Sequence, residues 1–215
     1  MRELFQEFLQ VLDREDKERA VHLAKQMLEA GVGIVQLYCD VLAPALNDWE
    51  CKEGETDICV WREHVRSSIV RTILEIAYPY VLRERDSRGT ARKGVSVAVL
   101  CPPDELHEIG PRMVADFFTL AGYDVTFVGA NTPIDDFIAA VRHIKPRYVA
   151  ISVTNYYHLM AVRKAIERLR DHLPEGTEVI VGGRAFEANP GKVKELGADR
   201  LLGTFEDIRA LDGGA

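Results

Sequence analysis

Residues 95–110 read VSVAVLCPPDELHEIG, which is a short apolar run, a turn with two prolines and the start of an amphipathic segment. A run of this length and composition, ended by proline, is typical of a buried strand. Helical spacing resumes after the turn, which favours a strand, a loop and a helix in succession. Glu105 and His107 therefore lie in the loop at the carboxyl end of a predicted strand.

The same unit of strand and helix repeats along the carboxy-terminal part of the chain. We predict five strands, at residues 95–101, 124–128, 148–153, 178–181 and 200–202. Such alternation predicts an α/β domain with a doubly wound parallel sheet in the order 2-1-3-4-5. Ligands of these sheets bind beyond the carboxyl ends of the strands, where the strand order reverses. The loops 102–110 and 152–157 meet at that point.

The amino-terminal part of the chain has a different period. Apolar residues there follow helical spacing, most clearly Ile34, Leu37, Tyr38, Val41, Leu42, Ala45, Leu46 and Trp49. A helix with such a stripe needs partner helices to bury it. We therefore expect a four-helix bundle over residues 1–85, a polar linker over 86–94 and the α/β domain over 95–215.

Composition excludes several classes of protein. A chain of 215 residues with 47% hydrophobic residues can bury a core, and its formal net charge of −7 predicts no direct binding to nucleic acid. No apolar run approaches the ~20 residues that cross a bilayer, so we expect no membrane association and a cytoplasmic location. The four cysteines form no Cys-x-x-Cys pair. We expect reduced thiols and core residues, neither zinc ligands nor disulfides.

The loops at the predicted crevice lack the motifs of the common ligands of such sheets. Neither the Gly-x-Gly-x-x-Gly of dinucleotide sites nor the Ser/Thr-rich turn of flavodoxins follows the first strand. Ser152 stands where a phosphoacceptor domain needs an aspartate. The loops offer instead the imidazole of His107, the hydroxyls of Ser152 and Thr154, and the pair Gly182-Gly183. An imidazole that donates one ring N–H to a carboxylate can present its other nitrogen to a metal ion.

Together these loops resemble the cobalamin-binding domain family. Its pattern is Asp-x-His-x-x-Gly after the first strand, Ser-x-Leu or Ser-x-Thr after the third and Gly-Gly after the fourth. This chain carries Glu105-x-His107-x-x-Gly110, Ser152-Val153-Thr154 and Gly182-Gly183 in the same order. The turn at 128–133 also resembles the family's segment after the second strand.

The resemblance implies a cobalamin cofactor whose benzimidazole tail is removed from cobalt and buried in the protein. His107 is then the lower axial ligand of cobalt, and Glu105 is its hydrogen-bond partner. Gly110 belongs to the same cofactor-binding motif. The implied tail pocket is lined by Ser152, Thr154, Gly182 and Gly183.

Two features resemble the cobalamin-dependent photoreceptor regulators more than the methyl-carrying corrinoid proteins. Glutamate stands at position 105 in place of the commoner aspartate. In the bundle, the regulators carry Trp, nine residues and then Glu-His. Glu63-His64 matches the end of that pattern, but thirteen residues lie between Trp49 and Glu63. Trp61 precedes His64 by three residues on the same helical face. The resemblance therefore implies an upper-face role for His64 and for Trp49 or Trp61.

Residue types alone leave simpler interpretations open. Ser152 and Thr154 are also typical helix caps, and Gly182-Gly183 is typical of a turn after a strand. The two tryptophans are equally typical of a bundle core. We assign no catalytic residue, because the cofactor carries the chemistry.

The prediction is a cobalamin-responsive sensory or regulatory module that binds adenosyl- or methylcobalamin. Such a module would signal through a partner protein or through homo-oligomers. The alternative is the corrinoid subunit of a methyltransferase system, which shuttles a methyl group between partner enzymes. Storage of cobalamin needs nothing further from the sequence.

Overall fold

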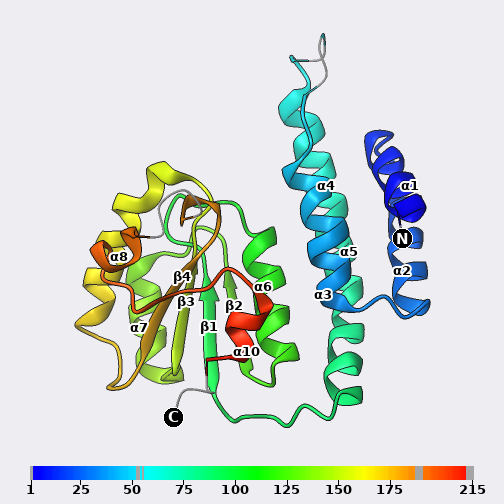
Figure 1. The fold of residues 1–215 in the computed structure, drawn as a ribbon. Helices are drawn as coiled ribbons and strands as arrows, with labels where there is room; N and C mark the ends of the chain where they lie inside the picture. Colours follow the sequence, from blue (N-terminus) through cyan, green and yellow to red (C-terminus); the bar gives the residue numbers. More distant parts are fainter. Residues whose placement is uncertain (1, 52–53, 55, 187–190, 212–215) are drawn as a thin grey trace. The chain divides into compact units, whose positions relative to one another are not determined.

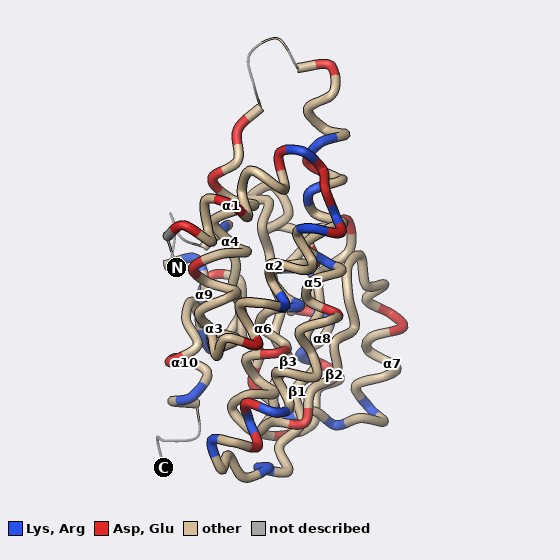
Figure 2. The backbone as a smooth tube through the Cα atoms, turned by 90° about the vertical axis from the view of Figure 1, so that its right-hand side faces the viewer, with Lys and Arg blue, Asp and Glu red and all other residues tan. Residues whose placement is uncertain are grey.

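The computed structural model describes residues 2–51, 54, 56–186 and 191–211 (Figure 1). The chain divides into two compact units, Met1–Ser87 and Arg88–Ala215. Acidic and basic residues are interspersed along the backbone of both units (Figure 2). Of the helices that the structure describes, none combines the length and the apolar character needed to cross a membrane.

In its described residues the first unit consists of helices and the turns that join them. Its elements are α1 (Arg2–Asp13), α2 (Lys17–Glu29), α3 (Ile34–Leu37), the π-helical turn η1 (Tyr38–Leu42), α4 (Ala43–Asn47) and α5 (Cys59–Ser87). Because α3, η1 and α4 follow one another without a break, they form one continuous rod. The described part of the unit therefore has four helical segments, namely α1, α2, the continuous α3–η1–α4 and α5. This arrangement confirms the predicted four-helix bundle.

The predicted apolar stripe forms the centre of this bundle. Six of its residues are at most 1% exposed, namely Ile34, Leu37, Tyr38, Val41, Leu42 and Ala45, and the last two, Leu46 and Trp49, are half-buried. Burial of an apolar stripe of this kind contributes most of the stability of a short helix.

The bundle extends slightly beyond its predicted end. Helix α5 continues to Ser87, two residues into the segment expected to be linker. Arg85 is buried although it is charged, because a long basic side chain can bury its aliphatic stem. Glu84 also ties this end of α5 to α3, since its Oε2 accepts the N–H of Ile34 at 2.7 Å. The polar composition of the segment concealed these contacts.

The second unit contains the predicted sheet. Its strands are β1 (Ser96–Leu100), β2 (Asp124–Gly129), β3 (Tyr148–Ser152), β4 (Glu178–Gly182) and β5 (Arg200–Leu201). They are paired in parallel in the order β2-β1-β3-β4-β5. Both the strand order and the positions of all five strands confirm the prediction.

Helices cover both faces of the sheet (Figure 1). On one face, α7 (Ile134–Ile144) and α8 (Leu159–Arg170) bury residues such as Val141 and Ile166 against Val149 and Val179. On the other lie α6 (Ile109–Leu120) and α10 (Phe205–Arg209), whose Phe117 and Phe205 rings are 5.6 Å apart. The short helices η2 (Tyr156–His158), η3 (Arg184–Phe186) and α9 (Lys192–Glu195) complete the unit. The loops after β1 and β3 thus emerge at one edge.

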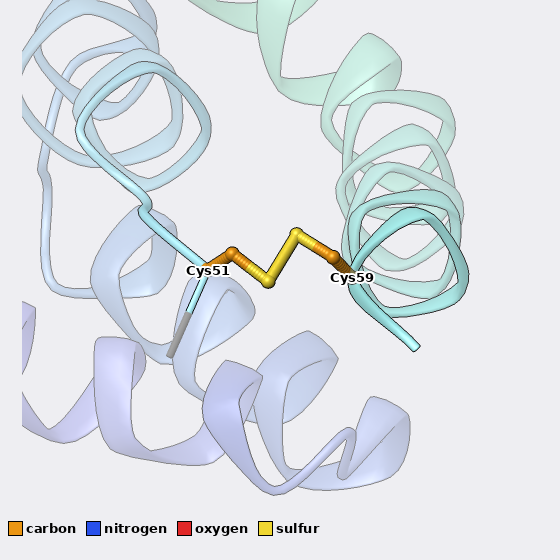
Figure 3. The surroundings of a disulfide bond; sticks show 2 residues. All are labelled: Cys51 and Cys59. Carbon is orange, nitrogen blue, oxygen red and sulfur yellow. A yellow bond between two sulfur atoms is a disulfide. The ribbon is translucent and has the colours of Figure 1, made fainter. Parts of the chain in front are cut away.

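The cysteines correct one expectation from the sequence. Cys51 and Cys59 form a disulfide, with their Cα atoms 5.6 Å apart and a separation of eight residues in the chain (Figure 3). The bond joins the segment after α4 to the first residue of α5, where the chain returns on itself. Of the remaining thiols, Cys101 is buried as expected and Cys39 is exposed. A spacing of eight matches no short motif, so the sequence did not reveal this pair.

Candidate functional site

The loop between β1 and α6 places Glu105 and His107 at the carboxyl edge of the sheet. The Glu105 side chain is fully buried, whereas the His107 side chain is 55% exposed. The Nδ1 atom of His107 lies 2.5 Å from Oε1 of Glu105, and the backbone N–H of His107 donates to the same oxygen at 3.2 Å. With Nδ1 engaged by the carboxylate, Nε2 is the ring nitrogen left to bind another group.

The turn after β2 fixes the shape of this loop. Asp104 and Asn131 both have positive φ angles, of 67° and 48°. The N–H of Asp104 donates to Oδ1 of Asn131 at 2.9 Å, and the N–H of Asn131 donates to the carbonyl of Glu105 at 2.9 Å. Asp and Asn tolerate this left-handed conformation better than most residues. The β2–α7 turn therefore supports the backbone beside His107.

The second oxygen of Glu105 joins this loop to the loop after β3. Oε2 accepts the backbone N–H groups of Thr154 at 2.9 Å and Asn155 at 3.0 Å. The Nδ1 atom of His158 lies 3.2 Å from the same oxygen. Sequence reasoning placed Thr154 at this point but missed Asn155 and His158. Their only signal was their position in or just beyond the loop predicted to face the crevice.

These donors determine the charge of the site. Burial opposes ionisation of Glu105, but hydrogen bonds from the N–H of Asn155, the His107 ring, and the N–H groups of Thr154 and His107 lower its pKa to about 2. The carboxylate is therefore ionised at neutral pH. A carboxylate that accepts the hydrogen bond from Nδ1–H makes Nε2 of the imidazole a stronger metal ligand.

A buried thiol, that of Cys101, lies close to the backbone of His107. Burial, together with the negative charges of Glu105 and Glu108, raises the pKa of Cys101 to about 12. Its Sγ is 3.7 Å from the carbonyl oxygen of His107, at the distance of a weak S–H hydrogen bond. Cys101 is therefore an uncharged packing residue at neutral pH, and it offers no thiolate ligand.

The predicted glycines differ in their surroundings. Gly183 has a φ of 99°, and a Cβ there would collide with the carbonyl oxygen of Val153. A Cβ on Gly182 would lie 2.8 Å from the carbonyl oxygen of Leu202. Backbone packing at the end of β4 thus requires both glycines. By contrast, apart from its chain neighbours and its own helix backbone, no described residue places an atom within 4 Å of the Cβ position of Gly110, in the first turn of α6.

Ser152 lies at the end of β3, half-buried and paired with Gly182 of β4 in the sheet register. The predicted tail-pocket residues are therefore neighbours at the carboxyl edge. Apolar side chains also remain exposed on the two bridged loops and the start of α8, namely Leu106, Tyr156, Tyr157 and Met160. Exposed apolar side chains gathered beside a buried charge are typical of a binding surface.

The other predicted cofactor residues belong to the bundle. Trp49 is half-buried there, with the guanidinium of Arg66 5.8 Å from its ring centroid. Arg66 is itself held by Asp13 at 2.9 Å and by the carbonyl of Ala45 at 2.8 Å. The Trp49 ring thus packs against Arg66 within the bundle.

Trp61 and His64 have a different environment. The Trp61 residue is 65% exposed, and His64 is exposed on the same helix three residues later. Residues three apart on a helix are neighbours on its surface. The structure therefore presents Trp61 and His64 as one exposed pair on α5.

A single imidazole, that of His107, fits a metal ion that is held mainly by a cofactor. Among the described residues, no group of three or more His, Cys, Asp and Glu side chains could hold a metal ion. A metal bound to His107 must then take most of its ligands from elsewhere, as cobalt does in a corrin ring. A carboxylate-held, half-exposed imidazole beside apolar side chains suits one axial position of such a metal.

A doubly wound parallel sheet with a carboxylate-held imidazole at the point of strand reversal defines a class of cofactor-binding domain. Residues 95–211, more than half of the chain, match the B12 binding domain family, and the chain belongs to that family. Its cofactor is cobalamin.

Known relatives of two kinds resemble the chain. It is 29% identical over 198 residues to the HTH-type transcriptional repressor CarH of Myxococcus xanthus, a match that covers 88% of this chain and 63% of the repressor. It is 24% identical over 170 residues to the trimethylamine corrinoid protein of Methanosarcina barkeri, covering 78% and 76%. The chain thus spans less than two thirds of the length of the repressor.

A solved structure resembles the fold over nearly the whole chain. The monomethylamine corrinoid protein of Methanosarcina barkeri superposes with a TM-score of 0.80 at 15% identity, covering 98% of this chain and 97% of that one. At this identity the likeness establishes the fold alone.

Proposed function

We propose that this protein holds cobalamin in the base-off form, with Nε2 of His107 as the lower axial ligand of cobalt. The contact between His107 Nδ1 and Glu105 Oε1 at 2.5 Å is the observation that carries this proposal. It fixes the ring and keeps the proton on Nδ1, so that the Nε2 lone pair is available. When bound, cobalamin would supply a cobalt–carbon bond that light can break, or from which the alkyl group can pass to a nucleophile while the bonding electrons stay on cobalt.

The side chains around His107 would take the rest of the cofactor. The exposed Leu106, Tyr157 and Met160 offer apolar surface to the corrin ring. The open space at the Gly110 Cβ position allows a ring to approach the first turn of α6. Ser152, Thr154, Gly182 and Gly183 would line the passage of the benzimidazole tail between the ends of β3 and β4.

The role that we propose for this cofactor is sensory or regulatory. Support comes from the likeness to the CarH repressor, which covers 88% of this chain and so includes residues of both units. Trp61 and His64 are exposed on α5, and in this role they would supply an indole and an imidazole to the upper face of the cofactor. Trp49 is the weaker candidate for that role, because its ring already packs against Arg66. Signalling would require a partner protein or a change in oligomeric state.

The second candidate function is that of a corrinoid methyl carrier. It is favoured by the sequence likeness to the trimethylamine corrinoid protein of Methanosarcina barkeri, which covers 78% of this chain and 76% of that protein. In this role His107 and Glu105 would hold the cofactor in the same way, and a partner methyltransferase would supply and receive the methyl group. The exposed His64 would then have no task at the cofactor.

The first experiment tests binding and ligation. The purified protein is mixed in the dark, without oxygen, with adenosylcobalamin or methylcobalamin, then desalted and examined by absorption spectroscopy, beside His107→Ala. We expect wild type to retain the corrinoid with a base-off, His-on spectrum and the variant to lose that spectrum. Failure to retain corrinoid, or the same spectrum in the variant, would overturn the proposed ligation.

The second experiment separates the two functions. The loaded protein is illuminated and its elution volume measured, beside His64→Ala and the control His22→Ala, which removes another exposed bundle histidine. A sensor is expected to change its elution volume on illumination, and His64→Ala should alter that response while His22→Ala should not. An unchanged elution volume favours the carrier, and equal behaviour of His64→Ala and wild type removes His64 from the mechanism.

A further inference from the structure

The two cysteines of the disulfide lie where the chain turns from α4 into α5 (Figure 3). Cys59 is the first residue of α5, and its Cα atom is 5.6 Å from that of Cys51. Both residues are half-buried, and the residues between them that the structure describes, Gly54 and 56–58, are exposed. A small thiol or disulfide in solution can therefore approach the pair. Disulfides within reach of solvent are among those that are readily reduced and formed again.

The first two turns of α5 contribute no buried side chain to the core of the bundle. The buried residues of this helix begin at Arg66, and none of residues 59–65 is buried. Arg62 donates to the carbonyl of Asp13, at 3.5 Å. Helices in proteins gain most of their stability from the packing of a buried face, and segments without such packing open easily. The covalent bond to Cys51 therefore fixes a segment that the core does not.

We propose that Cys51 and Cys59 are a redox-active pair, which a low-molecular-weight disulfide oxidises and the corresponding thiol reduces. The closed pair orders the first two turns of α5, and the open pair lets them fray. Trp61 and His64 lie within these turns. The redox state of the pair thus sets the order of the two residues proposed for the upper face of the cofactor. Only this last consequence rests on the function proposed above.

Cys59 is the cysteine that starts the exchange. It stands at the N-terminus of a helix of 29 residues, where the helix dipole favours a thiolate. This thiolate attacks one sulfur of glutathione disulfide, and one glutathione thiolate leaves. The Cys51 thiolate then attacks the Cys59 sulfur of the mixed disulfide, and the second glutathione thiolate leaves. Two electrons pass from the protein thiols to glutathione, and the two thiol protons go with them.

The first measurement follows this exchange in the apoprotein. Cys39→Ser removes the exposed thiol that would react beside the pair. The protein is equilibrated in buffers of glutathione and glutathione disulfide, trapped with maleimide and analysed by intact-mass spectrometry. We expect a dithiol in excess glutathione and a disulfide in excess glutathione disulfide. In the same background, Cys51→Ser should form the mixed disulfide at Cys59 about 10-fold faster than Cys59→Ser forms it at Cys51.

The second measurement follows the start of α5 by hydrogen exchange in the same apoprotein. We expect reduction to speed the exchange of the N–H groups of residues 62–66 about 10-fold. Residues 73–77 of the same helix are the internal control, because Ile73 and Ala77 are buried in the core. Cys51→Ser, which cannot close the bond, should exchange rapidly at residues 62–66 in both buffers.

Two results would overturn the proposal. One is a pair that stays a disulfide in excess glutathione or stays a dithiol in excess glutathione disulfide. The other is equal hydrogen exchange at residues 62–66 in the two redox states, which would mean that the bond does not order the start of α5. Both measurements use the apoprotein, so they decide the proposal whatever the cofactor does. Failure of the proposed cobalt ligation is detected separately, from the spectrum of His107→Ala.

Discussion

Oε2 of Glu105 accepts the backbone N–H of Thr154 at 2.9 Å, across 49 positions of the chain. The same carboxylate holds His107 through Oε1. One side chain thus spans the loops after β1 and β3, which are adjacent strands in the sheet. The length of that side chain should matter, because its two oxygens meet partners that belong to different loops.

Glu105→Asp shortens the bridge by one methylene. We expect it to keep the contact with His107, which is two residues away, and to lose the hydrogen bonds from Thr154 and Asn155. Two half-buried N–H groups without acceptors would lower the free energy of unfolding of the apoprotein by about 1–3 kcal/mol. Urea unfolding of the apoprotein measures this change, with Glu167→Asp on the exposed side of α8 as the control. An unchanged free energy in Glu105→Asp would mean that the loop after β3 follows the shorter side chain.

The low pKa of Glu105 predicts a loss of stability in acid. Burial opposes its ionisation, yet the four hydrogen bonds lower the pKa from 4.5 to about 2 in the folded protein. A carboxyl group with a lowered folded-state pKa stabilises the fold above its unfolded-state pKa. This contribution, at most about 3 kcal/mol, should be complete above about pH 4.5 and disappear as the pH falls towards 2.

Glu105→Gln tests this pH dependence, since an amide does not titrate in this range. The free energy of unfolding of the apoprotein is measured in urea at a series of pH values. We expect the difference between wild type and Glu105→Gln to shrink as the pH falls below 4.5. If the difference in free energy of unfolding between the two proteins stays constant down to pH 3, ionisation of Glu105 does not stabilise the fold.

Two glycines of the predicted site should respond oppositely to alanine. Gly183→Ala must strain a φ of 99° and push a Cβ into the carbonyl of Val153. We expect a loss of about 2–4 kcal/mol in the free energy of unfolding of the apoprotein. Gly110→Ala meets open space in a helix and should stabilise the apoprotein by about 0.5 kcal/mol.

Cobalamin affinity then separates a structural role from a binding role. If the open side of Gly110 faces the cofactor, Gly110→Ala should bind cobalamin more weakly although its apoprotein is more stable. Calorimetric titration with cobalamin, beside thermal unfolding of the apoprotein, measures both effects. Wild-type affinity in Gly110→Ala would place the cofactor away from the first turn of α6.

Much of this fold follows from patterns that depend on local chemistry. The β-rich runs predicted all five strands, because buried parallel strands are continuously apolar. Their alternation with helices predicted the strand order and therefore the meeting of the loops after β1 and β3. Glu105, His107 and Thr154 were accordingly expected together. The end of α5 at Ser87 was not predicted, because the charged residues near it were taken for an exposed linker, whereas Arg85 is buried.

The contacts that the sequence did not predict are made by backbone N–H groups and by a side chain at the end of the η2 turn. Thr154 was expected to contribute a hydroxyl, whereas the structure uses its N–H, which every residue except proline possesses. Asn155 contributes in the same way. His158 lies one residue beyond the loop predicted to face the crevice, and the η2 turn brings it back to Glu105. Residue type alone carries no signal for such contacts.

The disulfide between Cys51 and Cys59 predicts a definite order of thiol labelling. Cys39 is an exposed residue. Partial burial of its sulfur atom and the negative charge of Asp40 raise the pKa of its thiol. Cys101 is buried and has a pKa of about 12. We expect maleimide to label Cys39 first in the native protein, Cys101 only after unfolding, and Cys51 and Cys59 only after reduction. Peptide mass spectrometry assigns each label.

The same bond should stabilise the bundle where α5 begins. Closing a loop with a separation of eight residues removes entropy from the unfolded chain worth about 2–3 kcal/mol. The double variant Cys51→Ser, Cys59→Ser should lower the free energy of unfolding by about that amount, while Cys39→Ser should change it little. Because Trp49 lies two residues before Cys51, its fluorescence should also become easier to quench with acrylamide in the double variant. Rapid labelling of Cys51 and Cys59 in protein purified without reductant would show instead that both thiols are free in solution.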